Sequence, residues 1–121
     1  MSLNNFPQIS KAAVLYKNNS PLRLININLR EPKKYQVLVK IKYTGFCASQ
    51  FGEITGVKGK DKYLPHCLGH EASGIVIKTG KGVTKVKKKD LVVLHWMKSE
   101  GRECENIFYL NEEGKKINSG K

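Results

Sequence analysis

Two histidines, a thiol and a carboxylate lie within six positions, His66 to Glu71, in the stretch LPHCLGHEASG. A second thiol, Cys47, lies 23 positions before His70. Zinc binds cysteine sulfur, histidine nitrogen and carboxylate oxygen, and a catalytic zinc keeps three protein ligands and one open position. Cys47, His70 and Glu71 are therefore candidate zinc ligands. Each has an ordinary structural explanation when taken alone, and His66 and Cys67 compete for the same role, because spacing does not choose among them.

The segments that flank these side chains are expected to hold them at one end of a sheet. Apolar and polar residues alternate along Tyr35–Tyr43, which predicts a strand with Lys40 and Lys42 on one face. The other face is expected to carry Val37, Val39, Ile41 and Tyr43. Cys47–Ile54 is long enough for about two turns of helix. Ser73–Thr79 predicts a strand that begins beside the second pair of candidate ligands.

The rest of the chain adds short strands rather than long helices. Further strands are predicted at Lys11–Tyr16, Leu22–Leu29, Leu91–His95 and Ile107–Leu110. Short strands at roughly even spacing predict a small barrel or sandwich, and the strand–helix alternation of a parallel sheet is missing. Gly80-Lys81-Gly82 lacks the third glycine and the following helix of a dinucleotide-binding turn. We expect residues 1–10 to be a leader and residues 11–121 to form one domain that is incomplete at its C-terminus.

The chain is strongly basic, with a formal net charge of +12 and a sequence pI near 9.7. Such a charge favours anionic partners. Six lysines in the stretch 78–89 form a stripe with no acidic residue among them. The alternative function is therefore a small basic β-barrel module that binds nucleic acid or another anionic partner. Lysine dominates over arginine, however, and aromatics are not interleaved with the basic run, which favours a solvated lysine-rich surface.

Cysteine usage and hydropathy exclude two classes of protein. The three cysteines, Cys47, Cys67 and Cys104, match no small disulfide framework, so we expect a reducing, cytoplasmic location. The longest apolar run is too short to span a membrane, and the N-terminus lacks the pattern of a signal peptide. We interpret Cys67 and Cys104 as structural or incidental residues.

Four short motifs resemble one enzyme family. They are Cys47-Ala48-Ser49, Gly69-His70-Glu71-Ala72-Ser73-Gly74, Gly80-Lys81-Gly82-Val83 and Asp90-Leu91-Val92-Val93. Together they resemble the N-terminal part of the zinc-dependent medium-chain alcohol dehydrogenases, from about Lys11 to Val93. The resemblance implies a mainly β fold, a GroES-like barrel of short strands with one or two short helices. No nucleotide-binding Rossmann domain is expected, because the chain lacks the glycine-rich turn of such a domain.

The resemblance also assigns roles to individual residues. It implies that Cys47 and His70 hold a catalytic zinc ion and that Glu71 is a nearby glutamate that can become a ligand. Ser49 matches the hydroxyl residue that takes the proton of the alcohol. Trp96 falls roughly where the family places an aromatic side chain in the substrate pocket, although a core or surface tryptophan explains it equally well.

Several features of the family are missing from this chain. Gln50 stands where the family usually has an aspartate that orients the site, and Gly52 stands where many relatives have a proton-relaying histidine. No four-cysteine structural zinc lobe follows Trp96. We expect NAD(P) to bind only in a full-length enzyme, whose substrate would be a small alcohol or aldehyde. The chain is then expected to be a fragment that is inactive alone and that self-associates through a surface meant to face the missing domain.

Overall fold

The computed structural model describes residues 9–97 and 100–119, and these residues form eight strands and one helix. In chain order the elements are β1 (Ile9–Leu15), β2 (Arg23–Asn28), β3 (Val37–Thr44), α1 (Ala48–Thr55), β4 (His66–Cys67), β5 (Ala72–Thr79), β6 (Leu91–Leu94), β7 (Phe108–Asn111) and β8 (Lys116–Asn118). The predicted mainly β fold with a short helix after the third strand is confirmed. Helix α1, the only helix in the described part of the chain, is too short to cross a membrane.

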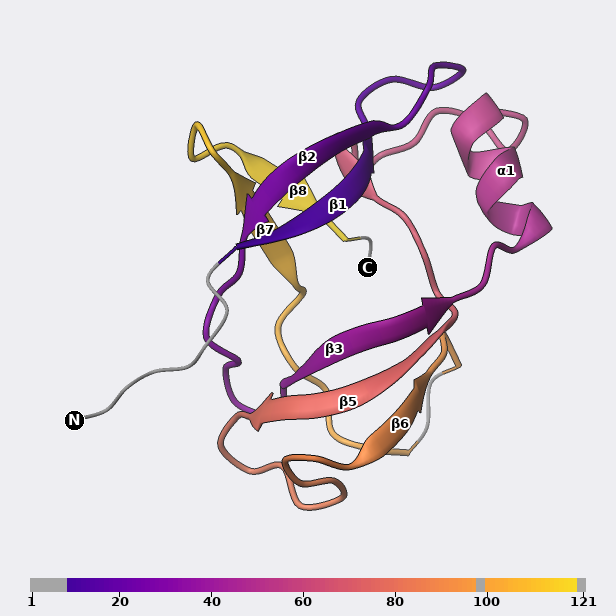
Figure 1. Ribbon diagram of the computed structural model, residues 1–121. Helices are drawn as coiled ribbons and strands as arrows, with labels where there is room; N and C mark the ends of the chain where they lie inside the picture. Colours follow the sequence, from indigo (N-terminus) through magenta and orange to yellow (C-terminus); the bar gives the residue numbers. More distant parts are fainter. Residues whose placement is uncertain (1–8, 98–99, 120–121) are drawn as a thin grey trace.

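The strands form two sheets that face each other across the molecule (Figure 1). One is a closed barrel in the order β1-β2-β7-β8-β4, and the other is an open sheet in the order β3-β5-β6. Helix α1 lies at the end of β3, beside the connection that runs from β4 to β5 (Figure 1). Within the described residues no strand–helix–strand unit of a Rossmann domain occurs.

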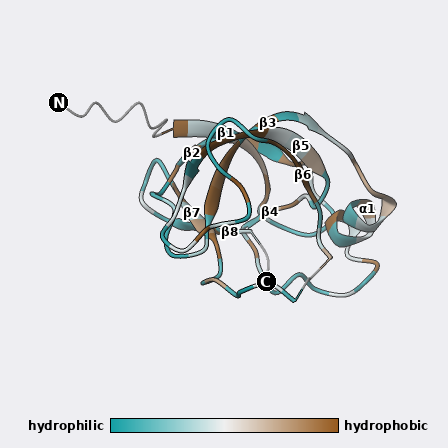
Figure 2. Ribbon diagram, turned by 90° about the horizontal axis from the view of Figure 1, so that it is seen from below, coloured by the Kyte–Doolittle hydropathy of each residue, from teal (hydrophilic) through white to brown (hydrophobic). Residues whose placement is uncertain are grey.

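The barrel holds the main hydrophobic core. Val14, Ile27 and Ile117 from three different strands pack together, and none is more than 5% exposed. Burial of such side chains stabilises the fold by about 1.5–3 kcal/mol each. Figure 2 shows that the hydrophobic colour lies mainly on strands while the loops are mostly hydrophilic. The open sheet contributes one fully buried side chain, Val76, from its central strand.

Two very short strands close the barrel, and neither was among the strands predicted from the sequence. Residues His66 and Cys67 of β4 pair with the end of β1, and His66 also pairs in parallel with Asn118 of β8. Strands of two or three residues leave no periodic pattern, so their pairing depends on tertiary structure. This closure fixes the position of His66 against the barrel, next to the loop that leads to His70.

Strand β3 does not have the single apolar face that its sequence predicts. Its pairing with β5 contains two register shifts. Ile41 pairs with Gly74, and Tyr43 pairs with the preceding residue of β5, Ser73. Because successive residues of a strand point to opposite faces, Ile41 and Tyr43 also lie on opposite faces. The prediction is therefore wrong for Tyr43, which is 78% exposed.

Candidate metal centre

The first candidate ligand, Cys47, is held at the start of helix α1. Cys47 is the N-cap residue, three positions beyond the end of β3. Its backbone N–H donates a hydrogen bond to Oε1 of Gln50 (2.9 Å), and its carbonyl accepts one from the Gln50 N–H (2.9 Å). Gln50 is buried, with 6% exposure. The residue that replaces the family's aspartate therefore fixes the backbone of Cys47, a contact that the sequence did not predict.

The other two candidate ligands lie where the chain enters β5. The Glu71 carbonyl accepts hydrogen bonds from the Gly45 N–H (3.1 Å) and from the Thr44 hydroxyl (2.9 Å), which joins the end of β3 to this loop. A Cβ atom added at Gly45 would lie 2.4 Å from Oε2 of Glu71. Glycine at position 45 thus leaves the space that the Glu71 carboxylate occupies, beside His70.

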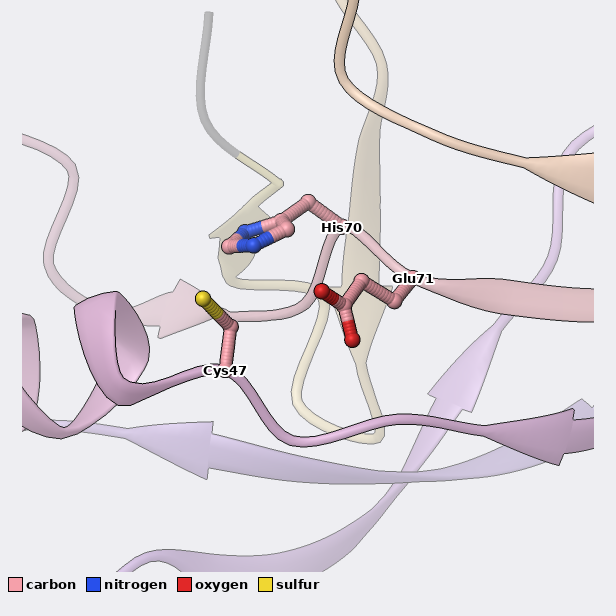
Figure 3. Close-up of side chains that lie close together, drawn as sticks. All are labelled: Cys47, His70 and Glu71. Atoms are coloured by element: carbon pink, nitrogen blue, oxygen red, sulfur yellow. The ribbon is translucent and has the colours of Figure 1, made fainter.

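The structure brings Cys47, His70 and Glu71 together. Their ligand atoms all lie within 4.8 Å of one another, and the three side chains point toward one another (Figure 3). Ligands around a tetrahedral zinc ion lie roughly 3.5 Å apart, as follows from metal–ligand bonds of about 2.0–2.3 Å. Small side-chain adjustments would therefore complete the site. Thiolate, imidazole and carboxylate are also the donor types that zinc accepts.

Hydrogen bonds favour the charged form of the thiol. The Ser49 hydroxyl donates to Sγ of Cys47 at 3.3 Å. This bond, a second one from the Ser49 backbone N–H and a third from His70 lower the pKa of Cys47 below its ordinary value of 9.0. The thiolate is the form that binds metals, so the local contacts prepare Cys47 for a cation. Ser49, to which the family resemblance assigns a proton-transfer role, thus contacts the Cys47 sulfur directly.

A cavity of about 890 Å³ opens beside the candidate metal centre. Its lining includes His70 and Glu71 together with His66, His95, Trp96 and the lysines of the loop 58–62. Trp96 is 71% exposed, so it forms part of the cavity wall rather than of the core. The structure thus places two further histidines, His66 and His95, on the cavity lining.

The competing ligands take other positions. His66 is 8% exposed and its Nδ1 lies 2.6 Å from Oδ2 of Asp61, a residue for which no sequence motif gave a signal. Cys67 packs against the barrel core, and burial raises the pKa of its thiol. Cys104 is exposed and unpaired. Among the described residues, the only group of three or more potential metal ligands is Cys47, His70 and Glu71.

Comparisons with known proteins find similarity over most of the chain. The family model described as alcohol dehydrogenase GroES-like domain matches residues 33–117. The chain is 38% identical over 96 residues to S-(hydroxymethyl)glutathione dehydrogenases of Escherichia coli O1:K1 and of Shigella sonnei. Each match covers 79% of this chain and 26% of the relative. A crystal structure of an alcohol dehydrogenase zinc-binding domain protein from Burkholderia ambifaria matches with a TM-score of 0.63 and 27% identity, over 69% of this chain and 22% of the other. The chain therefore spans about a quarter of the length of these relatives.

Proposed function

The chain belongs to the family of alcohol dehydrogenase GroES-like domains, and from this premise we propose that it carries the catalytic metal centre of a zinc-dependent oxidoreductase. The observation that supports the proposal most directly is the convergence of Cys47, His70 and Glu71 from two separate segments. In the proposed site Cys47 Sγ and a ring nitrogen of His70 hold the ion. Glu71 supplies a third, more weakly held ligand, because its side chain is exposed at the rim of the cavity.

Each residue of the site has a proposed chemical task. A bound zinc ion supplies a Lewis acid that lowers the pKa of an alcohol hydroxyl or polarises a carbonyl. Ser49 is proposed to receive the hydroxyl proton, since its own hydroxyl lies at the Cys47 sulfur and is half-buried. Gln50 keeps Cys47 in place through its backbone, and Gly45 leaves space for the carboxylate of Glu71.

The reaction of the whole enzyme is proposed from the relatives. They are named as dehydrogenases, and we propose hydride transfer between a small alcohol or aldehyde and NAD(P). The described residues contain no Rossmann domain, so we propose that residues 11–121 form one domain that does not transfer hydride without a cofactor domain. A test is to mix the zinc-loaded chain with NAD⁺ and ethanol and to follow absorbance of NADH, which we expect not to appear.

The zinc proposal is tested by elemental analysis of the chain purified without chelator. We expect one zinc ion per chain, and we expect the double substitution Cys47→Ser, His70→Ala to remove it. The matched control is Cys104→Ser, His95→Ala, which removes one thiol and one imidazole outside the ligand group. Full zinc content in the first variant would contradict the site, and equal loss in both would show that the metal is bound unspecifically.

The location, self-association and anion binding of the chain stay proposals. We propose a cytoplasmic protein that self-associates through the outer face of the open sheet, where Tyr43, Leu91 and Val93 are all at least 75% exposed. Analytical ultracentrifugation at rising concentration tests this, with Leu91→Lys expected to favour the monomer.

Binding to nucleic acid remains the alternative. Two lysines of the basic stripe 78–89 already form ion pairs within the chain, Lys78 with Glu31 and Lys87 with Asp90. Salt-dependent binding of an oligonucleotide would support the nucleic-acid alternative.

A further inference from the structure

A buried carboxylate and histidine form a pair outside the candidate metal ligands. Oδ2 of Asp61 lies 2.6 Å from Nδ1 of His66, and their side chains are 6% and 10% exposed. The other carboxylate oxygen, Oδ1, accepts the backbone N–H of Tyr63 at 2.7 Å. The Asp61 N–H donates in turn to Oδ1 of Asn18 at 3.1 Å. Asp61 is therefore fixed from both sides, and it fixes the ring of His66.

His66 belongs to the lining of the cavity, and its second ring nitrogen keeps some exposure. In the described part of the chain, the contact with Asp61 is the one hydrogen bond of this ring. No buried side-chain nitrogen or oxygen lacks a partner there, so Nε2 of His66 is not buried. His66 is nine-tenths buried and lines the same cavity as His70 and Glu71. Nε2 is therefore the ring atom that His66 can offer to a molecule bound in this cavity.

The hydrogen bonds decide which nitrogen carries the proton. A carboxylate is an acceptor, so Nδ1 of His66 must donate to Asp61 and the neutral ring carries its lone pair on Nε2. We infer that His66, oriented by Asp61, is a proton acceptor for a hydroxyl group bound in this cavity. This assignment is an alternative to Ser49, which is not among the residues that line the cavity. The inference rests on the proposed function for the identity of the hydroxyl as that of an alcohol substrate.

His95 provides an internal contrast in the same cavity. Its Nδ1 accepts the backbone N–H of Met97 at 3.1 Å, so the neutral ring of His95 carries its proton on Nε2. His95 is exposed and has no carboxylate contact among the residues described. The two histidines thus present opposite chemical groups, a lone pair from His66 and a donor from His95.

The proposed step is a proton transfer that needs no additional reactant. The O–H bond of the bound alcohol breaks, a bond between the proton and Nε2 of His66 forms, and an alkoxide remains. The ring becomes an imidazolium whose positive charge lies against the Asp61 carboxylate, which stabilises it electrostatically. Asp61 does not touch the alcohol, so it is a positioning residue. The cavity lysines of the loop 58–62 lie on the same lining and would attract the anionic product.

Nitrogen-15 NMR of the ¹⁵N-histidine-labelled chain tests the inference, because it separates protonated from unprotonated ring nitrogens. We expect the neutral His66 ring to be protonated on Nδ1 and the neutral His95 ring on Nε2. In Asp61→Asn, the amide oxygen can keep the Tyr63 N–H bond, which turns the amide nitrogen toward His66. That nitrogen is a donor, so we expect the proton to move to Nε2 in this variant, with no change at His95. A wild-type His66 ring that is protonated on Nε2 would overturn the inference, whether or not Asp61→Asn folds.

Reaction with diethyl pyrocarbonate gives a second readout, because the reagent attacks at an unprotonated ring nitrogen. Mass spectrometry after proteolysis measures the rate at each histidine. We expect His66 to be modified on Nε2 and its rate to fall about tenfold in Asp61→Asn, while His95 keeps its rate. Asp61→Glu is expected to restore part of the rate, and an unchanged rate in Asp61→Asn would overturn the role of Asp61. Both experiments are run with and without zinc, so that a failure of zinc binding is recognised separately from a failure of the histidine assignment.

Discussion

The barrel and the open sheet use hydrophobic side chains in opposite ways. In the barrel, Val14, Leu15 and Ile117 are fully buried. In the open sheet, Leu91 and Val93 of β6 point away from the core and are 81% and 75% exposed. The candidate metal ligands extend from the open sheet, just after β3 and just before β5, rather than from the barrel. The barrel thus holds most of the fully buried side chains, whereas the rim of the open sheet carries the candidate metal ligands.

The sharpest test of this division uses the same substitution in both regions. Leu15→Ala removes a fully buried side chain from β1 and should lower the free energy of unfolding by about 2–5 kcal/mol. Leu91→Ala removes an exposed side chain from β6 and, at dilutions where the chain is monomeric, should change the free energy of unfolding by less than about 0.5 kcal/mol. Urea unfolding followed by circular dichroism measures both. Equal losses would show that the outer face of the open sheet is covered, for instance by a second copy of the chain.

A second test asks whether the inner face of the open sheet is as closely packed as the barrel. A Cβ atom added at Gly74 would lie 2.2 Å from the carbonyl oxygen of Lys40 and 2.7 Å from Cγ1 of Val39. Because backbone must move to accept it, Gly74→Ala should cost about 1–3 kcal/mol of unfolding free energy. Ser73→Ala, one residue away on the outer face, is the matched control and should cost less than about 0.5 kcal/mol. If Ser73→Ala lowered the free energy of unfolding as much as Gly74→Ala, the outer face of the open sheet would be as closely packed as its inner face.

The sequence predicted the metal cluster better than it predicted the strand that leads to it. The side-chain types of Cys47, His70 and Glu71 suit zinc, and the family resemblance favoured them over His66 and Cys67. Neither step needed knowledge of the strand register. The face of β3 depended on a continuous alternation, and the two register shifts interrupt it. A shift of this kind depends on the partner strand, so the sequence of β3 alone does not reveal it.

The contacts that orient the site were the least predictable part. Asp61 lies in a loop rich in glycine and lysine, where a single carboxylate gives no pattern. It reaches His66 because β4, a strand of two residues, pairs with both β1 and β8. Gln50 was recognised only as a departure from the family, and its hydrogen bond to the Cys47 backbone became visible in the folded chain. Tertiary contacts, not local propensity, determine both.

A third prediction concerns the candidate metal ligands at the rim of the open sheet. Here we expect a substitution to lower metal affinity without lowering the stability of the metal-free chain. In Gly45→Ala the new methyl group must displace the flexible end of Glu71, since Oε2 would lie 2.4 Å away. Zinc affinity should fall by about tenfold, while the unfolding midpoint of the metal-free chain stays nearly unchanged. Competition with a chromogenic chelator measures the affinity. In the Glu71→Gln background the same substitution should have a much smaller effect, and a full tenfold loss there would show that Gly45 acts through another group.

The smallest expected effect is on the acidity of the Cys47 thiol. The Ser49 hydroxyl is the main cause of its lowered pKa, followed by the Ser49 N–H and then by His70. Ser49→Ala removes the first contact and keeps the second, so the pKa should rise part of the way toward 9.0. In the metal-free chain the rate of alkylation by iodoacetamide follows the thiolate fraction, because the thiolate is the nucleophile. The pH midpoint of this rate should therefore lie below 9.0 in the wild type and move upward in Ser49→Ala. Ser49→Thr keeps a hydroxyl and should restore the lower midpoint. If Ser49→Ala left the midpoint unchanged, His70 or the helix backbone would have to be the group that stabilises the thiolate. The contacts that prepare the Cys47 sulfur for a cation would then not include the Ser49 hydroxyl.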